Sequence, residues 1–305
     1  MQTTLKSPIT FSGIGLHTGR AVRMNVHPAS AEYGIWFRRT DLDGAQALIP
    51  ARWDAVVPSR LCTKLANGRA EVSTVEHLMA ALAGCGIHNA LIEIDGPEVP
   101  VMDGSAQPFV EGFLSRGLRR LSAPVRVLRI LEPVEVSEGD ARASLSPADT
   151  LEIDFEIDFA DRAIGHQAKR LSMANGAFLR ELSDSRTFCR NADVEAMRAA
   201  GLALGGSLKN AVVVEGDRVL SPGGFRHADE AVRHKMLDAL GDLALAAVPI
   251  LGRYRGERAG HALTNRLLRA LFARPGAFRL VTCSPAEAAR LPGACLEAAD
   301  LRAVA

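Results

Sequence analysis

The chain contains 305 residues, of which 48% are hydrophobic and 23% are charged. These proportions describe a globular protein with a large core, long enough for two domains, and they exclude an intrinsically disordered chain. Its 36 basic and 35 acidic side chains leave a formal net charge of +1, which excludes the strongly basic surface of a nucleic-acid-binding protein.

Neither a transmembrane helix nor a secretory signal is expected. The longest apolar run, residues 243–252, spans 10 residues, about half the length that crosses a bilayer. The N-terminal residues lack the apolar core of a secretory signal. Five cysteines are scattered along the chain without a C-x-x-C pair, which predicts free thiols and a reducing compartment. We therefore expect a cytoplasmic protein.

The first half of the chain begins with an expected β-hairpin. Residues 9–28 place Gly13, Gly15 and Gly19 in G-x-G-x-x-x-G spacing, which departs from the G-x-G-x-x-G of a dinucleotide-binding loop, and period-two alternation follows. The glycines are therefore expected to shape a turn rather than to hold a nucleotide. A polar, turn-rich stretch comes next. The later elements expected in this half are a helix from about Ser73 to Gly84, a strand over 90–95, and a turn at Asp103-Gly104 followed by a second helix.

A proline-marked connection at residues 122–124 leads into a second half, which again places strands before helices. This order predicts an α+β fold of two domains, residues 1–122 and 125–305, rather than a doubly wound parallel sheet. The elements expected in the second half are strands within 125–137, 142–147 and 151–159, a helix near 175–182, an irregular glycine-rich segment at 201–210, a hairpin over 210–224 with its turn at Gly216, helices over 229–247 and 262–273, and a strand over 279–283.

The helix expected over residues 229–247 carries His234, Asp238 and Asp242 at positions i, i+4 and i+8. At about 100° per residue the three drift by about 80° around the axis, so they share one face. Imidazole and carboxylate one turn apart are ligands that zinc accepts, and carboxylates on an otherwise apolar helix need a partner. The alternative that spacing leaves open is an ordinary surface pair of His and Asp.

A second candidate cluster is Glu76-His77, in the first turn of the other main helix. It lacks the second histidine of an H-E-x-x-H metalloprotease helix, but His234 and Asp238 would complete a three-ligand site with an open fourth position. Glu76 would then lie where it can take a proton from water. Spacing supports a second interpretation equally, because Ser73-x-x-Glu76 matches a capping box, in which Glu76 only satisfies an N–H group at the helix end.

One more histidine has two interpretations. His261 follows Gly260 just before the last clear helix. It could flank the N terminus of that helix, or it could be an acid above the metal site. Spacing does not decide between the two.

Five motifs stand in an order that resembles one enzyme family. They are STVEHLMAALAG from residue 73, VPVMDGSAQPFVEG from 99, LSDSRTF from 182, RHKMLDALGDL from 233 and GHALTNRLL from 260. The chain closely resembles the UDP-3-O-acyl-N-acetylglucosamine deacetylases of Gram-negative bacteria over nearly its whole length. The resemblance implies zinc-dependent hydrolysis of the N-acetyl group, which gives UDP-3-O-acyl-glucosamine and acetate in the committed step of lipid A biosynthesis.

The same resemblance implies the architecture. Two similar domains would each layer helices against a β-sheet and carry an insert, with the active site at their interface. The second insert, near residues 193–219, would form an apolar passage for the acyl chain. The residues suited to line this passage are Leu202, Leu204, Leu208, Val212, Val213 and Val214. A monomer with one Zn²⁺ ion and a small-molecule substrate, a UDP-linked acylated amino sugar, is expected.

Residue roles follow motif by motif. The zinc ligands of the family fall on His77, His234 and Asp238 of this chain. The general base falls on Glu76, which favours the base over the cap. The general acid or oxyanion stabiliser falls on His261.

The remaining matches concern orientation and substrate. Asp242 matches the residue that orients the histidine acid and keeps it charged. Thr187 matches a residue that polarises the carbonyl, and Lys235 matches one that contacts the substrate. Residues that match the lining of the acyl-chain region are Phe188, Gly206 and Ser207. His17, in GLHTG, is not a metal ligand of the family and stays unassigned.

Two other functions compete with this interpretation. A non-catalytic lipid or acyl-nucleotide binding protein on the same fold would have lost Glu76, His261 or a ligand, and all of them are present. A zinc amidohydrolase with a different acylated sugar as substrate would keep the same residues. Zinc content, measured together with acetate release from the UDP-linked acyl sugar, separates the three.

Overall fold

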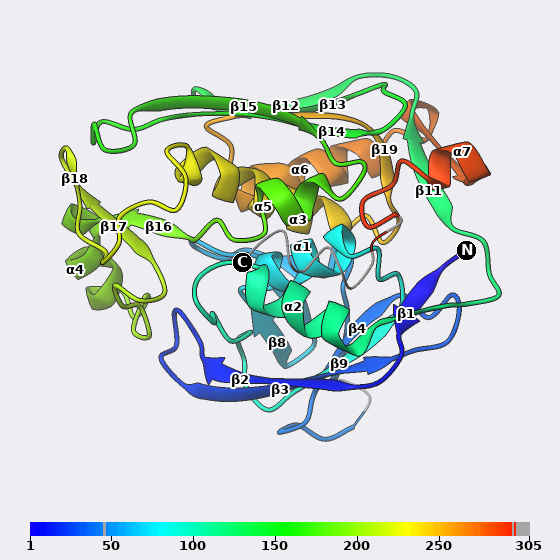
Figure 1. Cartoon of the computed structure of the whole chain (residues 1–305), viewed down its shortest axis with the longest axis horizontal. Coiled ribbons are helices and arrows are strands. Elements are labelled where there is room, and N and C mark those ends of the chain that lie inside the picture. The colour runs from blue at the N-terminus through cyan, green and yellow to red at the C-terminus, as the bar shows by residue number, and fades with distance from the viewer. Residues whose placement is uncertain (45–46, 295, 297–305) are drawn as a thin grey trace.

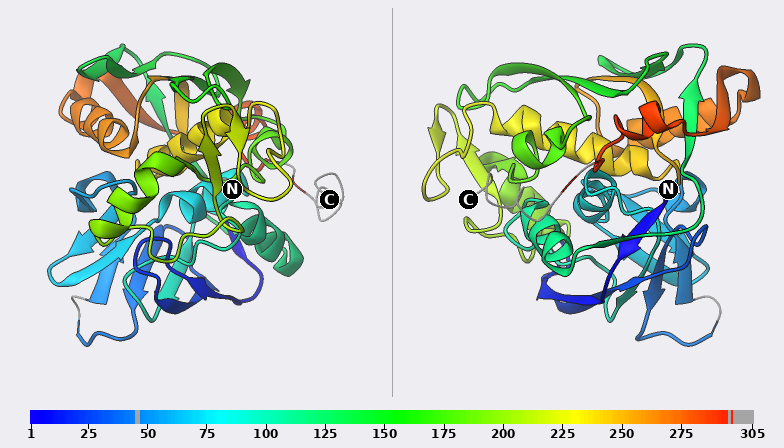
Figure 2. Two further views of the ribbon diagram at one scale, coloured as in Figure 1. Left: turned by 90° about the vertical axis from the view of Figure 1, so that its left-hand side faces the viewer. Right: turned by 45° about the vertical axis from the view of Figure 1, so that its right-hand side comes forward.

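Two β-sheets enclose a layer of helices in the computed structural model of this chain (Figure 1), and the side views show the same layering (Figure 2). The structure describes residues 1–44, 47–294 and 296. One sheet comes from the first half of the chain and the other from the second, so the expected α+β class is confirmed. The division into two domains stays a prediction, since buried apolar residues of both halves join in one large cluster.

The sheet of the first half has the strand order β2-β3-β9-β4-β5. The expected hairpin is confirmed, because β2 and β3 pair antiparallel with Phe11 opposite Met24. The turn-rich stretch that follows also forms strands, β4 to β8, which are two to five residues long and too short for their alternation to be recognised. The strands of this half are β1 (Thr3–Leu5), β2 (Ile9–Ile14), β3 (Ala21–Pro28), β4 (Ile35–Arg39), β5 (Leu48–Pro50), β6 (Val56–Val57), β7 (Lys64–Asn67), β8 (Ala70–Ser73), β9 (Ala90–Ile94) and β10 (Leu118–Arg120).

The sheet of the second half is built around β19, which pairs with β11, β13 and β14. Its strands are β11 (Arg126–Ile130), β12 (Val134–Glu138), β13 (Ala141–Ser146), β14 (Leu151–Asp158), β15 (His166–Ser172), β19 (Ile250–Glu257) and β20 (Phe278–Thr282). The sequence pattern missed two of them. In β15 no residue is fully buried, so apolar alternation is absent, and β19 begins inside the apolar run that continues from the preceding helix.

Helices α1 (Glu76–Gly84) and α5 (Glu230–Ala244) pack against each other between the sheets. Both are buried on several faces, as expected of helices that are apolar on most sides. Their close approach depends on Gly241, because a Cβ atom at this position would lie 2.0 Å from the carbonyl oxygen of Glu76. The absence of a side chain at Gly241 therefore brings the start of α1 onto α5.

The other helices surround this pair. They are α2 (Gln107–Arg116), α3 (Ala177–Glu181), α4 (Asn191–Ala199), α6 (His261–Phe272) and α7 (Pro285–Ala288), with 3₁₀ turns at Trp53–Ala55 and Pro275–Ala277. The helices expected near 175–182 and 262–273 are confirmed with small shifts of their ends, whereas α4 was not expected. No helix in the described part of the chain is long and apolar enough to cross a membrane.

A small three-stranded sheet projects at one end of the molecule (Figure 1, left). It contains β16 (Phe188–Arg190), β17 (Val212–Glu215) and β18 (Arg218–Val219). The expected hairpin turn at Gly216 is present. Helix α4 has no buried residue, because its two larger apolar side chains, Val194 and Met197, line a cavity instead.

The described cysteines are free thiols, as expected, and they are Cys62, Cys85, Cys189 and Cys283. Cys62 and Cys85 are buried. The fifth, Cys295, lies outside the described residues, as do residues 297–305 of the proposed second domain.

Gly241→Ala tests the close approach of α1 and α5. Alanine favours a helix by up to about 1 kcal/mol over glycine, but the added methyl group overlaps a backbone carbonyl. We therefore expect the free energy of unfolding to fall by about 1–3 kcal/mol. Thermal unfolding followed by circular dichroism measures it. Gly276→Ala, where the methyl group meets open space, is the matched control, and an unchanged melting temperature in Gly241→Ala would refute the constraint.

Candidate active site

Three candidate ligand residues meet where the first turn of α1 contacts α5. One ligand atom each from His77, His234 and Asp238 lies within 4.8 Å of the other two. Nε2 of His77 is 3.5 Å and Nε2 of His234 is 3.3 Å from Oδ1 of Asp238. All three side chains are buried. The structure thus brings together residues 157 positions apart (234 minus 77), as the resemblance implies.

The cluster fits a divalent metal ion. Oδ1 of Asp238 is buried and has no hydrogen-bond donor, an arrangement that costs free energy unless a cation or a donor satisfies the oxygen. Nδ1 of His234 donates to the carbonyl oxygen of Ser185 at 2.9 Å, which leaves Nε2 with its lone pair. Burial lowers the pKa of His234 to about 4, so the imidazole is neutral and able to bind metal at neutral pH.

Glu76 does not form the capping box. The residue before α1 is Val75, which makes no side-chain cap, and Ser73 Oγ donates to the carbonyl of Pro97 at 3.2 Å. Glu76 is the first residue of the helix, whereas a capping box needs an acid at the third position. The capping interpretation is therefore wrong. The Glu76 carboxylate instead lies beside His261, with Oε1 3.8 Å from Nε2 of that residue, and burial raises the pKa of Glu76.

His261 is the first residue of α6, and its Nε2 lies 3.9 Å from Oδ2 of Asp238 in the same cluster. Its Nδ1 lies 2.8 Å from Oδ2 of Asp242, and its Nε2 lies 3.8 Å from Oε1 of Glu76. Burial alone lowers the pKa of His261, but the carboxylates of Asp242, Glu76 and Asp238 outweigh it and raise that pKa to about 9. An imidazolium held at Nδ1, with Nε2–H directed at the site, is suited to donate a proton.

Thr63 joins the two acids and was not found from the sequence. Its backbone N–H donates to Oε2 of Glu76 at 3.0 Å, and its hydroxyl donates to Oδ1 of Asp242 at 2.5 Å. Thr63 lies just before β7 in the turn-rich stretch, where no spacing marks it. The carbonyl of Ser185 was missed for a simpler reason, since every residue carries one.

A cavity of about 940 Å³ adjoins the cluster and extends toward the small sheet. His234, Asp238 and His261 line it. The predicted carbonyl-polarising and substrate residues also line it, and they are Thr187, Lys235, Phe188, Gly206 and Ser207. Nζ of Lys235 donates to Oδ2 of Asp238 at 2.8 Å. Eight of the eleven predicted site residues therefore line one cavity. The other three, Glu76, His77 and Asp242, do not line it but contact residues that do.

The predicted apolar lining needs correction. Leu208 and Val213 line the cavity, but Leu202 and Leu204 are not among its lining residues. The other two, Val212 and Val214, face the main core. Successive strand residues point to opposite faces of a sheet, so β17 can offer the cavity only the valine between them.

A buried His₂Asp cluster with an acid–base pair beside it, in an α+β fold, fits a metal-dependent hydrolase. A family model described as UDP-3-O-acyl N-acetylglycosamine deacetylase matches residues 2–273. The chain therefore belongs to the UDP-3-O-acyl-N-acetylglucosamine deacetylase family, as its five motifs indicated.

Curated relatives with that name match this chain over most of their length. The one from Phenylobacterium zucineum is 52% identical over 282 residues, which cover 92% of this chain and 96% of the relative. That from Idiomarina loihiensis is 48% identical, with 92% of each chain covered. That from Anaeromyxobacter sp. is 46% identical, with 92% of this chain and 91% of the relative covered.

His234→Ala tests the metal cluster. Loss of a direct ligand should weaken metal binding by more than the roughly 10–100-fold typical of an outer partner. Metal content after dialysis, measured by atomic emission, reports it. His166→Ala, on the exposed face of β15, is the control that should keep its metal. Full metal content in His234→Ala would contradict the assignment.

Proposed function

We propose that the chain hydrolyses the acetamide group of UDP-3-O-acyl-N-acetylglucosamine, the reaction that commits this substrate to lipid A biosynthesis in its family. One zinc ion would be held by His77, His234 and Asp238. The observation that carries the proposal is the unpartnered, buried Oδ1 of Asp238 between two imidazoles, beside the pair of Glu76 and His261. Two imidazoles and a carboxylate are a ligand set that catalytic zinc accepts.

A bound zinc ion supplies Lewis-acid chemistry, polarising the acetyl carbonyl and lowering the pKa of water. Oε2 of Glu76 accepts the N–H of Thr63, which leaves Oε1 to take a proton from the attacking water. The water oxygen bonds to the acetyl carbon, and the carbonyl electron pair moves onto its oxygen. Thr187 and the cationic His261 stabilise that negative charge.

The C–N bond then breaks, and Nε2 of His261 gives its proton to the sugar nitrogen, so that the amine leaves without negative charge. The carbonyl re-forms, and the product acid loses its hydroxyl proton to give acetate. Asp242 holds Nδ1–H throughout, which keeps the imidazole oriented and favours its charged form before the transfer. The proton on Glu76 then passes to His261, directly or by exchange with solvent, which restores both groups.

The cavity supports the proposed substrate. Lys235, Phe188, Gly206 and Ser207 would contact it, since all four line the cavity that begins at the metal cluster. The apolar side chains of Leu208, Val213, Val194 and Met197 line the same cavity, and they suit a fatty acyl chain.

We also propose that the enzyme acts as a monomer in the cytoplasm. The ligands, the base, the acid and the residue that orients it all come from one chain, so the site needs no second subunit. Unpaired thiols at Cys62, Cys85, Cys189 and Cys283 suit a reducing compartment.

Glu76→Gln tests the role of the base. The amide keeps the shape of the side chain and can still accept the N–H of Thr63, but it cannot take a proton. We expect zinc content and melting temperature near those of the unchanged protein, with kcat lower by about 10²–10⁴-fold. Acetate release from the UDP-linked acyl sugar measures it.

The same assay separates the rival functions. Unchanged turnover in Glu76→Gln would show that Glu76 is not the base. Zinc bound by the unchanged protein without acetate release would favour a binding protein. Acetate release only from other acylated sugars would favour a zinc amidohydrolase with a different substrate.

Leu208→Glu tests the acyl passage. Each buried methylene contributes about 0.8 kcal/mol, so a carboxylate in the passage should lower kcat/KM for the long-chain substrate by at least about tenfold. A substrate with a short acyl group should be much less affected. Leu204→Glu is the matched control, since Leu204 is an exposed leucine of the same insert that does not line the cavity. Equal losses in both variants would refute the passage.

A further inference from the structure

The loop of residues 183–187 supplies the hydrogen-bond acceptor that orients a metal ligand. The carbonyl of Ser185 accepts Nδ1–H of His234 at 2.9 Å, and both groups are buried. Because Nδ1 carries the proton, Nε2 presents its lone pair toward His77 and Asp238. The position of this carbonyl therefore determines which nitrogen of His234 faces the metal cluster, and in which direction.

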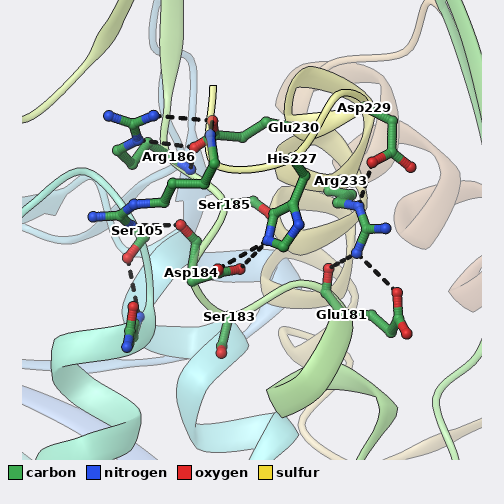
Figure 3. Close-up of polar contacts among 12 residues, drawn as sticks. Ser105, Glu181, Ser183, Asp184, Ser185, Arg186, His227, Asp229, Glu230 and Arg233 are labelled. Carbon is green, nitrogen blue, oxygen red and sulfur yellow. Dashed lines mark hydrogen bonds and ion pairs between the residues drawn. The ribbon is translucent and has the colours of Figure 1, made fainter. Parts of the chain in front are cut away.

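A buried ion pair holds this loop on α5 (Figure 3). Arg186 donates to the carboxylate of Glu230 from its backbone N–H at 3.0 Å, from Nε at 2.9 Å and from Nη2 at 3.0 Å. A fourth bond comes from the backbone N–H of Arg226 at 2.7 Å. A carboxylate has about four lone-pair sites, so Glu230 is saturated. The side chains are 9% (Arg186) and 1% (Glu230) exposed.

Helix geometry connects this pair to the ligand. Glu230 stands one turn before His234 on α5, so both project from the same face. On the loop, Arg186 follows Ser185 directly. A closed ring of contacts results: Glu230 binds Arg186, the adjacent carbonyl binds His234, and one helical turn leads back to Glu230. Movement of the pair would displace the carbonyl from Nδ1.

The loop is also tied to the first half of the chain. The N–H of Ala106 donates to the carbonyl of Ser183 at 3.0 Å, and the N–H of Thr187 donates to the carbonyl of Gly104 at 2.8 Å. These bonds hold the two ends of the loop. In its middle, Arg226 and His227 bind Asp184, and Glu230 binds Arg186. The contact with Glu230 is the nearest to the carbonyl that His234 uses, because the Arg186 N–H belongs to the same peptide group as that carbonyl.

We propose that Arg186 and Glu230 are positioning residues for the metal centre, which act by holding the Ser185 carbonyl on Nδ1 of His234. The inference rests on the proposed metal site and adds to it a pair to which the sequence analysis assigns no role, although Arg186 stands in the motif LSDSRTF. Arginine is required at this position because its planar fork meets the carboxylate at two points, whereas lysine offers a single ammonium group.

Arg186→Lys in the full chain tests the pair, because it keeps the positive charge and removes the fork. Co²⁺ titrated into the metal-free protein measures affinity, and its visible absorption reports the ligand geometry. We expect the dissociation constant to rise by about 10–100-fold, the usual effect of losing an outer partner of a metal ligand, with an altered spectrum. Glu230→Asp, which shortens the carboxylate arm and keeps its charge, should act in the same direction and replaces Arg186→Lys if that variant does not fold.

Arg39→Lys is the matched control. Arg39 on β4 is also 9% exposed and also bonds one carboxylate at two points, with Nε–Oδ1 of 2.8 Å and Nη2–Oδ2 of 2.7 Å to Asp41. It lies in the sheet of the first half and makes no contact with the loop or with α5 in its described hydrogen bonds. The Arg39→Lys substitution should lower the melting temperature and leave the Co²⁺ affinity unchanged.

The outcomes distinguish the positioning role of the pair from the metal site on which it rests. Failure of the unchanged protein to bind Co²⁺ would overturn the metal site itself. Normal Co²⁺ binding by the unchanged protein, with the same affinity and spectrum in Arg186→Lys and Glu230→Asp, would overturn the positioning role alone. An equal loss of affinity in Arg39→Lys would do so too, because general destabilisation would then explain the effect.

Discussion

The site depends on the contact between the backbones of α1 and α5. A side chain at Gly241 would collide with the carbonyl of Glu76, so only glycine lets the first turn of α1 reach α5. Glu76 and His77 are on one helix, and His234, Asp238 and Asp242 are on the other. Ligand atoms must lie within a few ångströms of a shared metal ion, and a wider separation of the helices would leave each group as an isolated buried polar residue.

The second constraint concerns charge. One face of α5 carries Glu230, His234, Asp238 and Asp242 into a mostly apolar interior, where an unpaired charge is costly. Each has a partner from another segment or from the same helix. These partners are Arg186 for Glu230, the Ser185 carbonyl for His234, Lys235 for Asp238, and Thr63 with His261 for Asp242. Oδ1 of Asp238 is the exception, and it lies where a metal ion would bind.

Much of this arrangement could be predicted from the sequence, because helical spacing is a local property. The positions of His234, Asp238 and Asp242 on one face required only the helix repeat, and the hairpin of residues 9–28 required only alternation. The pairing with His77 was one open interpretation until the resemblance supported it, because His77 lies too far along the chain for spacing to reveal the contact. Strand β19 was missed because its apolar start continues the run that ends α5, and α4 because Val194 and Met197 face a cavity rather than the core. Thr63 and the carbonyl of Ser185 act through geometry that only the folded chain creates.

The bridge made by Thr63 has a consequence for the acid and the base together. One threonine donates to both Glu76 and Asp242, and Asp242 in turn holds His261. A proton gained by Glu76 therefore alters the field at Asp242 and, through it, the proton affinity of His261. The carboxylate of Glu76 and the imidazole of His261, 3.8 Å apart, therefore titrate as a coupled pair. Each limb of a bell-shaped pH–rate profile would then belong to the pair, and a substitution of either group would move both limbs at once.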